Sequence, residues 1–209
     1  MLWFKQQQLM DIREQLEPHP LPPVDFAARS LPILESTGPW YRLSLARYPS
    51  ALYFDRTGNG RFDGPQQSYG ILYVGEDIFG PFIESFGRTH GILALTSGDL
   101  QERYLAQFVS VQPLRLVDLC GAGLPRIGAD NRINNGENYS ISRQWVQAIW
   151  QHPDPVDGIR YPSRHDPSRI LCGLFDRAKE NLQENKLGTL LEDPQTLAAI
   201  LDTYKFGLV

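Results

Sequence analysis

The segment that most constrains the fold is a short apolar run with a glycine at each end, Gly70-Ile71-Leu72-Tyr73-Val74-Gly75. The run is too short for a helix of ordinary length, and its β-branched and aromatic residues favour a strand. Because no polar residue interrupts it, we expect both of its faces to be buried. Such a strand needs neighbouring strands and packing layers, which the rest of the chain must supply.

Several neighbouring segments are candidates for those strands. Residues 41–45 alternate between polar and apolar side chains, and residues 108–111 and 114–119 have the composition of two further strands. Residues 56–60 predict a turn, because the Gly-Asn-Gly within them readily takes positive φ. Most of the chain from about residue 39 to residue 120 is therefore predicted as strand.

Helical patterns interrupt and follow the strands. Residues 76–88 predict a short helix that tolerates Pro81 if this residue lies in its first turn. Residues 100–108 are predicted to open with a helical turn capped by Ser97 or Asp99.

Later segments are more helical. Ser140 is predicted as the N-cap of a helix through residue 149, and Asp193 as the N-cap of a helix that begins with Pro194. At the N-terminus, residues 2–16 predict an amphipathic helical arm that ends in the proline-rich residues 17–23. The mixture of clustered strands and flanking helices predicts a single domain of the α+β class.

Bulk properties exclude several functional classes. The 209 residues suffice for one buried core, and a formal charge of −4 gives no support for binding nucleic acid. The sequence shows neither an apolar run of about 18 residues nor a signal peptide, so we expect a cytoplasmic protein without a membrane span. The two cysteines fit a reducing cytosol. The four histidines are scattered without metal-ligand spacing, so no metal is expected.

The residues that could carry chemistry suit a nucleotide. Neither a GxGxxG nor a GxxxxGK[ST] motif occurs, so arginines and tyrosines would have to hold it. Arg42 and Arg61 offer planar forks for phosphate, and Tyr73 offers a ring for stacking. Glu84 can stabilise positive charge on an anomeric carbon, and Ser163 can bond a phosphate or a ribose.

Each of these residues also has a purely structural interpretation. Arg42 lies in an apolar run, where a carboxylate such as Asp118 could pair with it. Taken alone, Glu84 is more typical of an exposed helix residue, and Ser163 of a turn. His165-Asp166 is weak evidence for a dyad, since neighbours in sequence point apart.

The order and surroundings of these residues resemble the RES-domain family, named for its Arg, Glu and Ser. The resemblance covers residues 39–177, and the segments that carry it are Trp40-Tyr41-Arg42, Gly60-Arg61-Phe62, residues 69–75, Glu84, Val117-Asp118-Leu119, residues 157–164 and Leu174-Phe175. Residues 1–38 then form an N-terminal helical arm and linker, and residues 178–209 a C-terminal helical extension.

The resemblance implies a fold similar to that of the diphtheria-toxin-like ADP-ribosyltransferases, with NAD as substrate. It implies the toxin of a bacterial toxin–antitoxin system, a phosphorylase (transferase) or glycohydrolase (hydrolase) that uses inorganic phosphate or water to break the nicotinamide–ribose bond. The implied partner is an antitoxin with a helix-turn-helix DNA-binding part, and the additions to the domain could also seal a homodimer. The family's pattern falls on Arg42, Glu84 and Ser163 as catalytic residues, and on Arg42, Arg61, Tyr73 and Ser163 as NAD-binding residues.

Two other functions remain open on the sequence. A protein ADP-ribosyltransferase would use the same pocket with a protein side chain as the acceptor. A catalytically weak sensor would bind NAD or ADP-ribose only, although such a module has no need of the carboxylate of Glu84.

Overall fold

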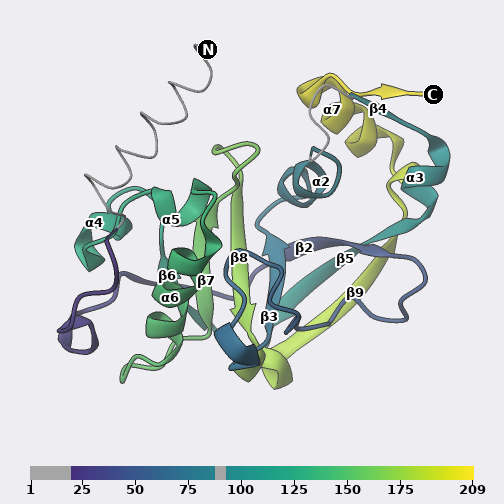
Figure 1. The fold of residues 1–209 in the computed structure, drawn as a ribbon. Coiled ribbons are helices and arrows are strands. Elements are labelled where there is room, and N and C mark those ends of the chain that lie inside the picture. The colour runs from purple at the N-terminus through teal and green to yellow at the C-terminus, as the bar shows by residue number, and fades with distance from the viewer. Residues whose placement is uncertain (1–19, 88–92) are drawn as a thin grey trace, which may run out of the picture.

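The computed structural model describes residues 20–87 and 93–209, which build one large sheet with helices packed against it (Figure 1). Its eight strands follow the order β1-β6-β7-β8-β3-β2-β5-β9. All neighbouring strands pair antiparallel except β6 and β7, which are parallel. The strands are β1 (Ile33–Ser36), β2 (Trp40–Leu45), β3 (Ile71–Gly75), β5 (Arg103–Ser110), β6 (Leu114–Asp118), β7 (Gly158–Pro162), β8 (Ile170–Phe175) and β9 (Leu182–Gly188).

The helices form two groups at the two ends of this sheet (Figure 1). The first group, beside β6 and β7, contains α4 (Gly123–Ile127), α5 (Arg132–Asn135) and α6 (Tyr139–Trp150). The second group, around β2 and β5, contains α2 (Phe79–Phe86), α3 (Ser97–Gln101) and α7 (Pro194–Tyr204). Next to α7, β4 (Ala94–Leu95) and β10 (Gly207–Leu208) pair in parallel as a small second sheet. The predicted α+β class is confirmed.

Short 3-10 turns complete the chain. They are η1 (Phe26–Ala28), η2 (Pro65–Gln67), η3 (Asp176–Asn181) and η4 (Leu190–Glu192). In the part of the chain that the structure describes, no helix has the length and apolar character to cross a membrane.

The central strand β3 is buried on both faces, as its composition predicts. Ile71 and Tyr73 point to the side covered by the helices, which we call the helical face, and Leu72 and Val74 point to the opposite face. Ile71 and Leu72 are 0% exposed and Val74 is 2% exposed. Burial of such a side chain contributes roughly 1.5–3 kcal/mol, so this strand anchors the cores on both sides of the sheet.

The helical face carries two apolar clusters, one under each helix group. Trp145 and Ile149 of α6 pack with Ile159 of β7, and Phe82 of α2 packs with Leu43 of β2. A third cluster lies on the opposite face.

Residues 103–110 differ from the helical prediction for residues 100–108. They form β5, which pairs with both β2 and β9, because Tyr104, Ala106 and Phe108 are buried on one face at strand period. The helical turn α3 ends before them. Its N-cap is Thr96, whose hydroxyl accepts a 3.1 Å hydrogen bond from the Asp99 amide. The predicted caps were therefore wrong, although Asp99 closes the turn from its third position.

The other helix predictions hold with small changes. The predicted helix at residues 76–88 is confirmed as the shorter α2, with Pro81 in its first turn. The cap of α6 is Asn138 rather than Ser140, since Asn138 Oδ1 accepts from the Ser140 amide at 3.0 Å. Asp193 caps α7 as predicted, by accepting from the Thr196 amide. The predicted N-terminal arm helix, residues 2–16, lies outside the described residues.

Candidate active site

Glu84 of α2 and Ser163, directly after β7, meet on the helical face. Ser163 Oγ donates a 2.6 Å hydrogen bond to Glu84 Oε1. Ser163 Oγ also accepts hydrogen bonds from the backbone amides of His165 and Asp166, at 3.1 and 3.2 Å. A hydroxyl has one proton, and two amide donors occupy its lone pairs, so the proton is directed at Glu84. Glu84 Oε1 is thereby the acceptor of this hydrogen bond.

The loop after β7 creates this arrangement. The Ser163 amide donates to the carbonyl of Arg169 at 2.8 Å and closes the loop at its base. Serine hydroxyls commonly accept from amides two and three residues further on, which is the turn chemistry expected for Ser163. Ser163 is only 2% exposed, so its hydroxyl is fixed by packing as well as by its partners.

His165, which the sequence offered only as weak evidence for a dyad with Asp166, is a neighbour of Glu84. Its Nε2 lies 3.9 Å from Glu84 Oε2, and its side chain is 19% exposed. Asp166 points elsewhere, since its carboxylate accepts from the Tyr204 hydroxyl and from Arg169 Nε. The two neighbours therefore have different partners and form no dyad. His165 lies two residues after Ser163, within the same turn. This spacing is the sequence signal that could have placed His165 near Glu84.

Arg61 approaches the pair from the loop between β2 and β3. Its guanidinium stacks 4.4 Å from the centre of the Tyr139 ring, and its Nη1 donates to the carbonyl of Gly136. Its Nη2 is buried and has no hydrogen-bond partner among the described residues. Burial lowers the pKa of Arg61, and the charge of Arg164 lowers it further, while Tyr139 and Glu84 act in the other direction. A guanidinium stays charged even so, and it would gain from an anionic ligand.

Tyr73 fixes the loop that carries Arg61. Its hydroxyl donates to Asp63 Oδ1 at 2.8 Å and accepts from the Phe62 amide at 3.0 Å. Asp63 is 0% exposed, and its Oδ2 accepts from the Gly60 amide at 2.7 Å. Burial raises the pKa of Tyr73 well above its ordinary value, as does the Asp63 carboxylate, so the phenol remains a donor. Tyr73 therefore acts on the site through the loop.

A second arginine clamps the same loop. Arg143 of α6 donates from Nε and Nη2 to the Gly60 carbonyl, at 3.0 and 2.9 Å. Three residues around this loop were not expected from the sequence: Arg143, Asp63 and Tyr139. Asp63 could have been found from the quoted motif, three residues after Gly60. The other two lie on a helix far away in sequence, and no local pattern connects them with the loop.

Arg42 does not join this cluster. It pairs in register with Ala106, which packs in the cluster on the opposite face together with Trp40. Its Nη1 donates to the carbonyl of Tyr53 at 3.3 Å, and burial lowers its pKa although Asp55 and Glu184 lie near enough to oppose the shift. Asp118, the partner considered for Arg42 from the sequence, instead accepts from Arg160 at 3.0 Å.

The structure thus brings together Arg61, Glu84 and Ser163, with Tyr73 in support. Tyr161 of β7 lies close by, and burial together with the charge of Glu84 raises its pKa well above the ordinary value. This arrangement joins a cationic donor, a carboxylate and a fixed hydroxyl, which suits a ligand that carries phosphate and develops positive charge. Among residues 20–87 and 93–209, no group of three or more His, Cys, Asp and Glu side chains is placed to hold a metal ion.

Known proteins resemble this chain in both sequence and fold. The model of the RES domain family matches residues 39–195. A protein described as "Probable toxin y4kH", from Sinorhizobium fredii (strain NBRC 101917 / NGR234), is 32% identical over 119 residues, which is 57% of this chain and 93% of that protein. The crystal structure of the M. tuberculosis MbcT-MbcA toxin-antitoxin complex contains a similar fold, with a TM-score of 0.53 and 17% identity over 78% of this chain and 89% of that chain.

Proposed function

The chain belongs to the RES-domain family, and from this premise we propose that it is an NAD-consuming toxin that cleaves the bond between nicotinamide and ribose. The relatives named as toxins support the toxin part of the proposal. The observation that carries the catalytic part is the 2.6 Å hydrogen bond from Ser163 to Glu84, next to Arg61, whose buried Nη2 has no partner within residues 20–87 and 93–209.

The residues fit NAD by their chemistry. Arg61 would donate from Nη2 to an oxygen of the pyrophosphate, which would satisfy a buried donor that lacks a partner in the described part of the chain. Glu84 would face the ribose next to nicotinamide, with its charge kept in place by Ser163. Arg42, on the opposite face, takes no part in this proposal, and Tyr73 holds the Arg61 loop instead of stacking on the ligand.

The reaction then requires little of the protein besides position and charge. As the carbon–nitrogen bond breaks, its electron pair leaves with nicotinamide, which departs as a neutral molecule. Positive charge develops on the ribose, and the nearby Glu84 carboxylate stabilises it. Phosphate or water supplies an oxygen to the same carbon, giving phosphorylated ADP-ribose or ADP-ribose. A protein ADP-ribosyltransferase would differ only in the acceptor.

The purified protein should release nicotinamide from NAD, measured by chromatography and mass with and without inorganic phosphate. A requirement for phosphate would identify a phosphorylase, and release in water alone a glycohydrolase. Release that requires an added protein would identify a transferase. Survival of NAD under all three conditions would refute the proposed function.

A matched pair of variants tests the role of Glu84. Glu84→Gln keeps the shape of the side chain but removes its charge, and we expect turnover to fall about a hundredfold or more, as for other preorganised electrostatic groups. Glu180→Gln makes the same change at an exposed position, without a partner among the described residues, and should leave turnover unchanged. Equal activity of the two variants would remove Glu84 from the mechanism.

We also propose that the protein acts in the cytoplasm and binds an antitoxin with a helix-turn-helix part. Expression of the chain alone should deplete cellular NAD and stop growth, and coexpression of a neighbouring gene for such a protein should restore both. A Glu84→Gln variant that remains as toxic as the native chain would contradict NAD consumption as the cause.

A further inference from the structure

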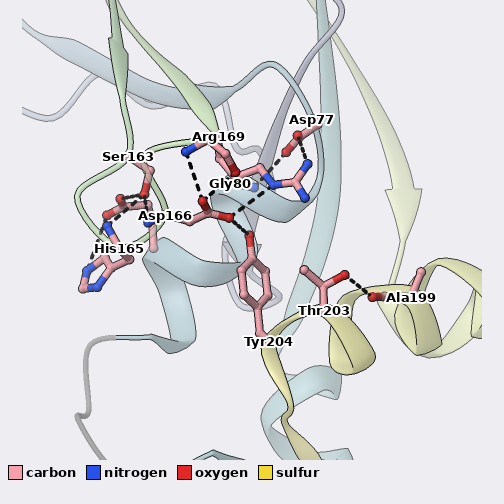
Figure 2. A network of polar contacts seen from close by, with 11 residues as sticks. Asp77, Gly80, Ser163, His165, Asp166, Arg169, Ala199, Thr203 and Tyr204 are labelled. Atoms are coloured by element: carbon pink, nitrogen blue, oxygen red, sulfur yellow. Dashed lines mark hydrogen bonds and ion pairs between the residues drawn. The ribbon is translucent and has the colours of Figure 1, made fainter.

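We propose that Tyr204, in the C-terminal helix α7, is a positioning residue for the Ser163–Glu84 pair and acts through the loop of residues 163–169. This inference rests on the proposed function. Tyr204 lies beyond residue 195, where the match to the RES domain ends, so nothing in that match assigns it a role. Figure 2 shows Tyr204 reaching from α7 toward Asp166, beside Ser163 and Arg169.

Tyr204 is linked to Ser163 through Asp166. The Tyr204 hydroxyl donates to Asp166 Oδ2 at 2.9 Å, and the Asp166 amide donates to Ser163 Oγ at 3.2 Å. The other carboxylate oxygen of Asp166 accepts from the amide and the hydroxyl of Ser168, at 3.0 and 2.6 Å. Tyr204 therefore gives the loop a hydrogen bond from α7, in addition to the bonds that Ser163 and Arg169 make to Glu84 and Asp77.

Further contacts link the same loop to α2, the helix that carries Glu84. Arg169 lies between them, since its Nη1 donates to Asp77 Oδ2 at 3.0 Å and its Nε to Asp166 Oδ2 at 3.4 Å. Asp77 Oδ1 in turn accepts from the Gly80 amide in the first turn of α2, at 2.9 Å. Figure 2 shows this series of contacts running from Asp77 to Tyr204.

The ring of Tyr204 also packs directly against α2. Its ring stacks parallel to that of Phe82 in α2, with 6.2 Å between centroids and 3° between planes. Tyr204 thus touches the Glu84 helix with its ring and the Ser163 loop with its hydroxyl. Burial raises the pKa of Tyr204 to about 12, as does its bond to Asp166, so its proton stays available for that bond at neutral pH.

A positioning role predicts a specific kinetic result. Tyr204→Phe keeps the ring on Phe82 but removes the hydroxyl, so we expect the fold to persist and kcat for NAD to fall about tenfold, the effect of one lost hydrogen bond to a charged group. KM should change less than about twofold, because the proposed contact with the pyrophosphate, from Arg61, is untouched. A fall in kcat below about twofold, or an effect confined to KM, would overturn the inference.

The control is the neighbouring residue in the same helix. Thr203 is exposed, and its hydroxyl donates to the Ala199 carbonyl within α7, away from the loop (Figure 2). Thr203→Val removes this hydroxyl and should leave kcat unchanged. A loss of kcat as large as that of Tyr204→Phe would assign the effect to the general stability of α7 and refute the positioning role.

A double variant tests the route through Asp166. If Tyr204 acts only through this carboxylate, Asp166→Ala combined with Tyr204→Phe should be little worse than Asp166→Ala alone. Multiplication of the two single effects would show that Tyr204 acts independently of Asp166, contrary to the proposal.

Hydrogen exchange separates this inference from the proposed function. In Tyr204→Phe, the amides of His165, Asp166, Ser168 and Arg169 should exchange faster, and in Thr203→Val they should not. If the native protein leaves NAD intact, the proposed function fails, and the exchange result still decides whether Tyr204 holds the loop. If NAD is consumed and the loop exchanges equally in all three proteins, only the positioning role fails.

Discussion

Replacing Tyr73 by Phe tests the interpretation that this tyrosine holds the Arg61 loop. The change removes one hydroxyl and leaves the ring in the core. That hydroxyl donates to the fully buried Asp63 at 2.8 Å and accepts from the Phe62 amide at 3.0 Å. Two partners therefore lose a bond at once, and one of them is a carboxylate.

The magnitude follows from the two lost bonds. A hydrogen bond to a charged group contributes about 1.5–3 kcal/mol, and a buried amide left without an acceptor costs about 1–3 kcal/mol. We expect the free energy of unfolding to fall by about 3 kcal/mol. For a chain of this size, a loss of 1 kcal/mol lowers Tm by roughly 2–4 °C, so Tm should fall by about 9 °C.

Urea unfolding followed by tryptophan fluorescence measures this change, with Tyr161→Phe as the control. Tyr161 is also a buried tyrosine on the helical face, 7% exposed, and its hydroxyl makes no hydrogen bond among the described residues. We expect Tyr161→Phe to change the free energy of unfolding by less than about 0.5 kcal/mol. Equal effects of the two substitutions would refute the role given to the Tyr73 hydroxyl.

Three further predictions concern the loop, the pH dependence of stability and the thiols. Gly60→Ala should lower both Tm and affinity for NAD, measured by melting and calorimetry, because the added Cβ would lie 2.3 Å from Asp63 Oδ1. Burial opposes ionisation of Asp166, but hydrogen bonds from its neighbours hold its pKa below the usual value. The ionised Asp166 therefore stabilises the fold above about pH 4, and this contribution is lost as the pH falls further. In urea titrations below about pH 4, the difference in unfolding free energy between the native protein and Asp166→Asn should shrink. Burial raises the pKa of Cys120 to about 12 and that of Cys172 well above its usual value. A thiol reagent at pH 8 should therefore label the partly exposed Cys120 slowly, and the buried Cys172 only at the rate of unfolding.

The strands were more predictable than the boundaries of the short helices. The central strand followed from residues 71–74 alone, because burial on both faces leaves a distinctive apolar run. Residues 100–108 misled the prediction because a helical turn, α3, leads almost directly into the strand β5. Residues 103–110 form a strand because they pair with β2 and β9, which are distant in sequence. A local sequence pattern does not reveal such partners.

The site was predictable in its residue types but not in its geometry. Arg61, Glu84 and Ser163 were found from their order in the sequence, and the structure places them together. Arg42 was included because it lies in the same kind of context. A shift of one residue in strand pairing moves a side chain to the other face of the sheet. The face that Arg42 occupies is therefore known only from its pairing with Ala106 in the structure.

The sheet explains why residues distant in sequence meet at this site. Strand β8 pairs antiparallel with both β3 and β7, so β3 and β7 run in the same direction and end at the same edge. Their ends lie two strand spacings apart, about 10 Å, which is within the combined reach of a loop and a helix that start there. Ser163 follows β7, and α2 with Glu84 follows β3, so two residues separated by 79 positions come within hydrogen-bond distance. Arg169 links the loop of residues 163–169 to the first turn of α2 through Asp77, and Tyr204 adds a second contact, from α7 to the same loop.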